Sequence, residues 1–296
     1  MNITKNVFDG TNNKTIETSF AKALQISTEE LNLLLNLFLI KEKTDLNSPK
    51  FTLDNFLKYC KESNQVRNIT LPFFDKVIFF HKTSTIDNGN FLKENGLLDL
   101  DKLLTLPSPL FTYLKSKGIE FVFTNENVLI NISGKVMPLM DLPCNKIISS
   151  KRRIISRLIK TTDYPLEGIT GFLFLEDALI NPTYQYINHA PEFLIDLDNC
   201  ISGILKEWQN SSEQLIVKCE ADLTSWYCPG DNKQEESPSK KSYKIGIEAF
   251  DYLAKLYGKN YRFSLGKKSP DYYPFISYGN GIPAEKIIEI ISPSSR

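Results

Sequence analysis

The sequence predicts an α+β fold in which a small helical subdomain, residues 1–68, precedes a larger domain, residues 69–296. Two observations lead to this prediction. The first 68 residues contain a helix-start signal and apolar residues at helical spacing. After residue 70 the chain has many short β-prone segments and a few helices, without the regular strand–helix repeat of a parallel sheet.

Composition and charge leave the kind of partner open. Lys plus Arg and Asp plus Glu each number 35, so the net charge indicates no particular partner, although a local basic patch would suffice for nucleic acid. No segment has the length of an apolar membrane span, and the first residues lack the apolar run of a signal peptide. We therefore expect a cytoplasmic protein without a membrane partner.

The cysteines predict reduced thiols. Their number is odd, their spacings are wide, and no pair has the two-residue spacing of a zinc site. Reduced and mostly buried thiols are therefore favoured over zinc ligands or disulfides, and we expect no metal. The five are Cys60, Cys144, Cys200, Cys219 and Cys228.

Helix signals dominate the N-terminal part of the chain. Ser27 and Glu30 have the spacing of a capping box, and an apolar run follows directly. Residues 1–14 are polar and are expected to fray. The apolar helix must cover another part of this chain or, as the less favoured alternative, a partner. Helices are expected at residues 15–24, 31–40 and 52–60.

Residues 76–98 are the segment around which the functional prediction is arranged. Val77–Phe80 is apolar and β-prone, which predicts a buried strand. A histidine and two hydroxyl side chains follow in His81–Ser84, at the expected end of this strand. Asp87–Gly96 then has the pattern of a short helix that ends at a left-handed glycine. The histidine could bind a ribose hydroxyl, or it could simply end the strand.

Beyond residue 98 the pattern is one of short strands with interspersed helices. Pro107 and Pro109 are expected to break a helix over residues 100–117. Residues 229–242 are polar and of low complexity, which predicts an exposed loop. Further helices are expected at residues 149–161, 191–208 and 245–257, and strands at residues 119–123, 128–132, 135–140, 169–175, 214–219, 261–264, 275–278 and 285–291.

Residues 149–161 combine basic and apolar residues at helical spacing. The apolar face carries isoleucine and leucine, and the opposite face is basic. This pattern is typical of a solvated helix, and also of a surface that contacts an anion or a nucleic acid. Five residues would form that surface: Lys151, Arg152, Arg153, Arg157 and Lys160.

Two short patterns occur in the order and at the spacing of one enzyme family. In the first, His81-Lys82-Thr83 follows a strand, and residues 91–97 then form a short helix that stops at Gly-Leu. In the second, Gly171–Phe174 reads Gly-x-x-Phe, and Tyr184 follows the glycine by 13 residues. In these patterns the chain resembles the ADP-ribosyltransferase superfamily, in the branch of the poly(ADP-ribose) polymerases and the bacterial toxins that modify DNA or RNA.

The resemblance covers residues 76–292 and implies a split antiparallel β-sheet core of the ADP-ribosyltransferase type. It also implies that His81 binds the nicotinamide ribose of NAD, assisted by Thr83 or Ser84. A tyrosine would stack on the nicotinamide. Tyr184 matches that tyrosine, and Tyr186 is the alternative if the register shifts.

Three further residues enter through the same resemblance. Lys82 stands where many relatives have a glycine whose backbone binds the nicotinamide amide, so its side chain would crowd that contact. Gly171 and Phe174 belong to the second pattern and would help to form the NAD site. A glycine inside a strand independently indicates the close approach of another backbone or of a ligand.

The family's late acidic residue has no direct counterpart, since Tyr273 and Pro274 occupy its place. The reaction requires a carboxylate there, because the departure of nicotinamide leaves positive charge on the ribose. Asp271 is the nearest acid of the same strand parity. Glu285 and Glu220 are more distant alternatives.

The resemblance implies an NAD-dependent ADP-ribosyltransferase that uses NAD as its substrate and modifies a nucleic acid or a protein. A bacterial toxin or antiphage defence effector, with an antitoxin or regulator as a further partner, would suit such a chain. The first alternative is a catalytically inactive module that binds NAD or another nucleotide. The second is a nucleic-acid-binding regulator that uses the basic helix at residues 149–160.

Overall fold

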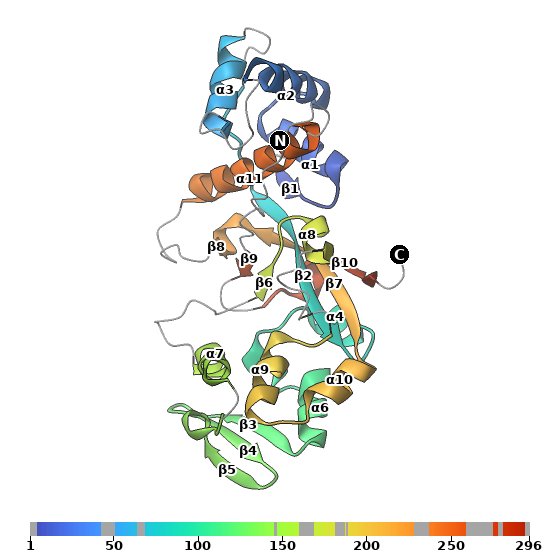
Figure 1. Ribbon diagram of the computed structural model, residues 1–296, viewed down its shortest axis with the longest axis vertical. Helices are drawn as coiled ribbons and strands as arrows, with labels where there is room; N and C mark the ends of the chain where they lie inside the picture. Colours follow the sequence, from blue (N-terminus) through green and yellow to red (C-terminus); the bar gives the residue numbers. More distant parts are fainter. Residues whose placement is uncertain are drawn as a thin grey trace.

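The computed structural model describes residues 5–42, 51–63, 69–144, 147–159, 169–180, 187, 189–227, 237–258, 275–277 and 281–293. These residues form a mixed α+β structure, which confirms the predicted fold class. Figure 1 shows an elongated molecule with helices at one end, β-sheet in the middle and a second lobe at the other end. Within the described ranges, no helix is long and apolar enough to cross a membrane.

The helical end combines helices from both the N-terminal and the C-terminal part of the chain (Figure 1). The predicted capping box forms, because the N–H of Glu30 donates to Ser27 Oγ over 3.1 Å and the N–H of Ser27 donates to Glu30 Oε2 over 2.7 Å. The helices of this end are α1 (Asn13–Ala23), α2 (Thr28–Glu42), α3 (Leu53–Glu62) and α11 (Pro238–Gly258). One hydrophobic core continues from these helices into the central sheet, and the division at residues 68 and 69 stays a prediction.

The central sheet has four strands in the order β1-β2-β7-β10. The pairs β2–β7 and β7–β10 are antiparallel, whereas β1 runs parallel to β2, so the sheet departs from the expected antiparallel core. The expectation that residues 1–14 fray is wrong for β1, because Phe8 is fully buried. The strands are β1 (Val7–Asp9), β2 (Lys76–Thr85), β7 (Glu213–Asp222) and β10 (Ile287–Ile291).

A smaller antiparallel sheet with the order β6-β9-β8 meets the central sheet. Its strands are β6 (Ile169–Gly171), β9 (Phe275–Ser277) and β8 (Trp226–Tyr227). Phe172, directly after β6, exchanges two backbone hydrogen bonds of 2.9 Å with Phe80 of β2. Helix α8 (Leu175–Ile180) follows this bridge. The edge of β2 opposite β7, hereafter its outer edge, is therefore covered first by β1 and then by Phe172.

The far lobe comprises the described residues between Leu100 and Ile159 and between Glu192 and Ser211, and it has a hydrophobic core of its own. The strands predicted at residues 119–123 and 128–132 form an antiparallel pair, and the predicted helix break at Pro107 and Pro109 is confirmed. Helix α4 (Asn90–Asn95), which ends at Gly96 with φ of 79°, connects β2 toward this lobe. The elements of the far lobe are α5 (Leu100–Leu103), α6 (Pro109–Ser116), β3 (Ile119–Phe123), β4 (Val128–Ile132), β5 (Lys135–Pro138), α7 (Ile148–Ile159), α9 (Glu192–Cys200) and α10 (Leu205–Ser211).

Several predicted boundaries are wrong. The strand expected at residues 169–175 ends at Gly171, and α8 begins at Leu175. Strand β2 continues to Thr85, so His81 lies inside the strand. The helix expected at residues 191–208 is two helices, because Asp198 Oδ1 accepts three successive backbone N–H groups after α9 and Gly203 has φ of 101°. The loop expected at residues 229–242 is helical from Pro238, where α11 begins. The strand expected at residues 261–264 lies outside the described residues.

The expectation of reduced cysteines is wrong for one pair. Cys144 and Cys200 form a disulfide that joins the segment before α7 to the end of α9. Cys60 and Cys219 are free and buried, as expected, and burial raises the pKa of each thiol to about 12. Cys228 lies outside the described residues. The two bonded cysteines are 56 residues apart in the sequence, and this wide spacing does not predict a disulfide.

Candidate ligand-binding cavity

The two segments that carry the family resemblance lie side by side in the fold. The backbone bridge between Phe80 and Phe172 joins them, and His81 Nδ1 lies 2.6 Å from the carbonyl oxygen of Thr170. Both contacts link residues about 90 positions apart in the chain. The segments at residues 76–98 and 169–175 therefore form one structural unit.

Gly171 makes this close approach of β6 to β2 achievable. A Cβ atom at this position would lie 2.5 Å from Phe79 Cδ2 and 3.0 Å from the carbonyl oxygen of Phe80. Any side chain here would push the two strands apart, so the glycine serves the packing of two backbones. The expectation of a close backbone approach at Gly171 is confirmed, and its role toward NAD stays a prediction.

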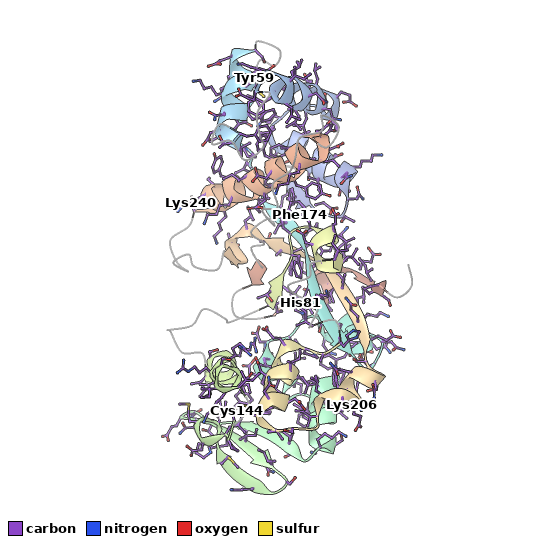
Figure 2. The ribbon with its side chains drawn as sticks, viewed as in Figure 1. Tyr59, His81, Cys144, Phe174, Lys206 and Lys240 are labelled. Carbon is purple, nitrogen blue, oxygen red and sulfur yellow. A yellow bond between two sulfur atoms is a disulfide. The ribbon has the colours of Figure 1, made fainter. Side chains whose placement is uncertain are left out.

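A cavity of about 460 Å³ lies between the second half of β2 and the far lobe. This volume falls in the range of about 300–1,000 Å³ that is typical of small-molecule sites. Residues His81 to Thr85 line it from β2, and the far lobe contributes residues of α5, α6, α7, α9 and α10. Figure 2 shows His81 at the junction of the central region with the far lobe.

The environment of His81 disfavours the charged form of its imidazole. Burial lowers the pKa of its imidazole below the ordinary value of 6.5, and this effect outweighs the hydrogen bond to Thr170, which acts in the opposite direction. A neutral imidazole that bonds a carbonyl must donate through Nδ1–H, because the carbonyl oxygen can only accept. Nε2 is then left as an acceptor, which is the form that binds a hydroxyl group.

The backbone of Lys82 faces the outer edge of β2. In an antiparallel pair, successive residues direct their backbone groups alternately to the two edges of the strand. Phe80 directs its N–H and C=O to the outer edge, where they bond Phe172, so Lys82 does the same two residues later. No strand in the described part of the chain pairs with β2 beyond Phe80 on this edge. These backbone groups could therefore bind a ligand amide.

The side chain of Lys82 is buried, with 4 % of its surface exposed, and it lines the cavity. Its Nζ has no hydrogen-bond partner among the described residues. Burial lowers the pKa of this amine, because removal from water penalises the charged form. The family resemblance assigns Lys82 an NAD contact through its backbone, with a side chain that would crowd this contact, and no pattern in the sequence predicts the burial of that side chain.

Ser84 and Trp208 form a further polar contact at the cavity wall. Trp208 Nε1 donates to Ser84 Oγ over 3.0 Å, and both residues are buried. The sequence did not predict a place for Trp208 at the site, because its pattern put this residue at the end of a helix over residues 191–208. The contact links α10 to β2, and it places an indole ring at the cavity.

The remaining predicted NAD-site residues fall into three groups. Phe174 lies outside the cavity lining, because it stacks on Tyr252 at a ring distance of 4.7 Å and packs against Phe8 in the core of the helical end. Thr83 lines the cavity. Three residues lie outside the described part of the chain: Tyr184, Tyr186 and Asp271.

Neither alternative acid lines the cavity. Glu220 of β7 pairs with Lys76 and with Lys286, and its hydrogen bond to Lys76 is the main cause that holds its pKa below the usual value. Glu285 is exposed. The carboxylates that do line the cavity are Asp99, Asp101 and Glu192, which sequence reasoning did not select.

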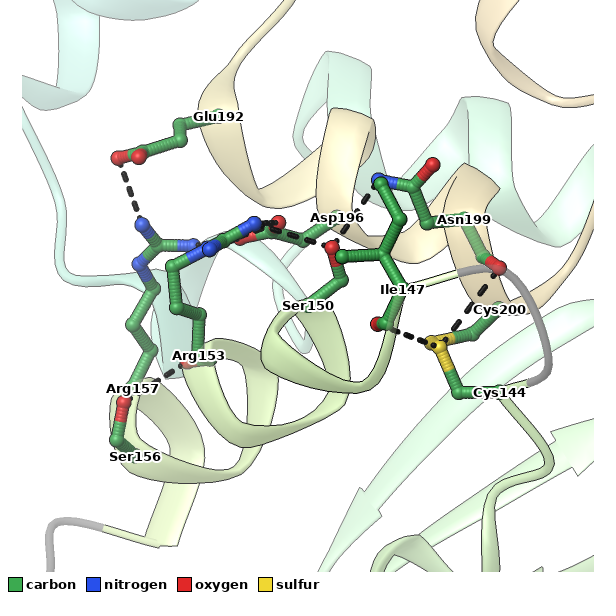
Figure 3. A network of polar contacts seen from close by, with 10 residues as sticks. All are labelled: Cys144, Ile147, Ser150, Arg153, Ser156, Arg157, Glu192, Asp196, Asn199 and Cys200. Carbon is green, nitrogen blue, oxygen red and sulfur yellow. Dashed lines mark hydrogen bonds and ion pairs between the residues drawn. A yellow bond between two sulfur atoms is a disulfide. The ribbon is translucent and has the colours of Figure 1, made fainter.

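The basic helix α7 turns two of its arginines toward α9. Figure 3 shows Arg153 and Arg157 converging on Asp196, which is 1 % exposed. Arg153 Nε lies 2.9 Å and Arg157 Nη1 lies 2.8 Å from Asp196 Oδ2, and Arg157 also pairs with Glu192 at 2.6 Å. These contacts hold α7 on α9. A role of this helix in binding nucleic acid stays a prediction, both for the two paired arginines and for Lys151 and Arg152. Lys160 lies outside the described residues.

Comparisons with known proteins give no independent identification. The chain matches no protein-family model, no curated protein sequence and no solved structure.

Proposed function

We propose that this protein is an NAD-dependent ADP-ribosyltransferase that transfers ADP-ribose from NAD to a nucleic acid or a protein. The observation that supports it best is the contact of His81 with Thr170, which joins the two family-like segments beside a cavity of nucleotide size. The neutral imidazole presents Nε2 as an acceptor, which suits a ribose hydroxyl. The backbone of Lys82 at the outer edge of β2 suits the nicotinamide amide.

In the proposed reaction, the bond between nicotinamide and ribose breaks and an acceptor oxygen or nitrogen bonds to the ribose carbon. Positive charge develops on the ribose, and a carboxylate stabilises it. Asp271 remains the predicted acid. Glu192 and Asp99 line the cavity and are the alternatives that the geometry favours over Glu220 and Glu285.

Nicotinamide release from NAD tests this proposal, with the purified chain and a mixed pool of RNA, DNA and cell protein as acceptors. His81→Ala should reduce the rate about 100-fold or more, because removal of one positioning contact at the reacting centre has effects of that order. His189→Ala is the matched control, since the chain has two histidines and His189 does not line the cavity. Equal rates for both variants would contradict the proposal.

The second candidate is a module that binds NAD or another nucleotide without turnover. The absence of a family-type acid at Tyr273 and Pro274 favours this candidate. NAD binding that is lost in His81→Ala, without any nicotinamide release by the wild type, would establish it. A nucleic-acid-binding regulator has less support, because Arg153 and Arg157 are engaged with Asp196.

The proposed effector would act in the cytoplasm, with an antitoxin or regulator as a partner. The disulfide between Cys144 and Cys200 bears on this location, because structural disulfides persist in oxidising compartments and are rare in the cytosol. Thiol labelling of the protein in intact cells would test it. Labelling of both cysteines without a reductant would agree with a cytoplasmic protein.

A further inference from the structure

Lys82 is a buried ammonium group at the wall of a cavity, and the described residues provide it with no counter-ion. Its Nζ has no hydrogen-bond partner among the described residues, and burial lowers the pKa of the amine. Burying an unpaired charge is unfavourable unless hydrogen bonds or an opposite charge compensate it. The fold therefore places an amine with unmet hydrogen-bonding capacity at the wall of the cavity.

Two other lysines of the described chain, one buried and one partly buried, show how this fold treats such groups. Lys241 is 7 % exposed and its Nζ donates to the carbonyl oxygen of Leu223 over 3.2 Å. Lys218 lies 3.6 Å from a carboxylate oxygen of Asp9. Lys82 differs from both because it lines the cavity and has no such described partner.

Ser84 adds a second donor on the same face of β2. Residues two apart in a strand point to the same side of a sheet and are separated by about 7 Å. Ser84 Oγ accepts the Trp208 N–H, and the described residues offer no acceptor for its hydroxyl proton. An oxygen of a ligand placed between Lys82 and Ser84 would satisfy both donors.

We propose that Lys82 and Ser84 form an anion-binding subsite in this cavity, which takes the phosphate or carboxylate group of a small organic ligand. The cavity volume of about 460 Å³ admits a molecule much larger than the anionic group alone. Most of the remaining lining is apolar, and Asp99, Asp101, Glu192 and Arg157 also lie along it, which suits a ligand with a largely apolar body, some polar groups and one anionic end. The subsite does not require that the protein cleaves NAD, although the NAD pyrophosphate would fit its chemistry.

Binding can be measured on the full chain through Trp208, because its indole lies at the cavity wall and bonds the proposed subsite. Tryptophan fluorescence would be titrated with ADP-ribose, inorganic pyrophosphate and citrate, and with adenosine as an uncharged probe. ADP-ribose and pyrophosphate test a phosphate group, and citrate tests a carboxylate. The wild type should bind at least one anionic probe.

The decisive variant is Lys82→Met, which removes the charge and keeps the length of the side chain. It should weaken binding of the anionic probe about tenfold or more, because a hydrogen bond to a charged group is lost, and leave adenosine binding unchanged. Lys82→Arg keeps the charge and should retain part of the affinity. Lys241→Met is the matched control for a buried lysine away from the cavity, and it should bind the probe as the wild type does.

Two results would overturn the proposal: no anionic probe binds to the wild type, or a folded Lys82→Met protein binds it as tightly as the wild type. If Lys82→Met fails to fold, Lys82→Gln and Ser84→Ala provide the same comparison. Nicotinamide release separates this inference from the proposed function. Anion binding that depends on Lys82, without NAD cleavage, would support the subsite and contradict the transferase function. NAD cleavage, with anion binding unchanged in Lys82→Met, would support the transferase function and contradict the subsite.

Discussion

Two buried charged groups, Asp196 in the far lobe and Lys82 in β2, are treated in opposite ways by the same chain. Asp196 accepts hydrogen bonds from Arg153 and Arg157, and neighbouring polar groups complete the network (Figure 3). Lys82 is also buried, with 4 % of its surface exposed, but its Nζ has no hydrogen bond to any described residue. Asp196 connects two helices, whereas Lys82 lines a cavity.

The difference separates a structural charge from a candidate functional one. A fully paired buried carboxylate with two arginines makes α7 and α9 dependent on each other. A buried amine without a hydrogen-bond partner among the described residues costs free energy, and an anion bound at the proposed subsite would offset part of that cost. Four substitutions can break or sharpen this comparison.

The largest effect is expected for Asp196→Ala. This change leaves Arg153 and Arg157 without their shared carboxylate, and removal of one partner from a buried pair typically costs about 3–5 kcal/mol. Chemical denaturation should show a loss of that size in the free energy of unfolding. Glu192→Gln, which affects the more exposed contact of Arg157, should cost much less. Equal losses of unfolding free energy in the two variants would show that the pairing of the arginines with Asp196 is not the main contact between α7 and α9.

The next effect concerns the disulfide beside this network. Cys200→Ser opens a covalent connection across 56 residues, and loss of such a bond typically costs about 2–4 kcal/mol. Thermal unfolding of the variant, and of the wild type in a reductant, should show the same decrease in melting temperature. A decrease in the variant alone would mean that the wild-type thiols are already reduced.

Lys82→Met should change stability in the opposite direction. The folded-state pKa of Lys82 lies below its ordinary value of 10.5, so the unfolded chain binds more protons and wild-type stability rises with pH between those two values. The variant should be more stable by about 1–3 kcal/mol at neutral pH, the range for an unsatisfied buried polar group. Its advantage should shrink as the pH approaches 10.5. A less stable variant at pH 7 would indicate that the amine has a partner in the folded protein.

The smallest effect is expected for an exposed ion pair. Lys58 and Glu62 lie 3.9 Å apart on α3, and both side chains are more than half exposed. Glu62→Gln should cost about 0.3–0.5 kcal/mol, and high salt should abolish the difference. A larger, salt-independent loss would mean that α3 depends on this pair.

Local signals in the sequence predicted much of the secondary structure. The capping box at Ser27 and Glu30, the stop at Gly96 and the break at Pro107 and Pro109 each depend on a few neighbouring residues, and all three are present. One error concerns long-range packing. Strand β1 is a three-residue segment in an otherwise polar N-terminal stretch, yet it is ordered by its pairing with β2 across about 70 residues.

The candidate site was predictable only in part for the same reason. His81 and the Gly171 segment could be selected from local patterns, and the fold brings them together. The burial of Lys82, the position of Trp208 and the pairing of Arg153 with Asp196 depend on contacts between distant segments. Periodicity along one helix or strand carries no information about such contacts.

The packing of α11 against α1–α3 has a consequence for biosynthesis. Phe250 of α11 contacts Phe38, Phe51 and Phe56, so the N-terminal helices lack their apolar cover until α11 has left the ribosome. Roughly 180 residues separate α3 from α11, which corresponds to roughly 10–40 s of translation. During this interval the nascent chain exposes phenylalanine side chains, and it would be a natural client for a chaperone that binds at the ribosomal exit tunnel.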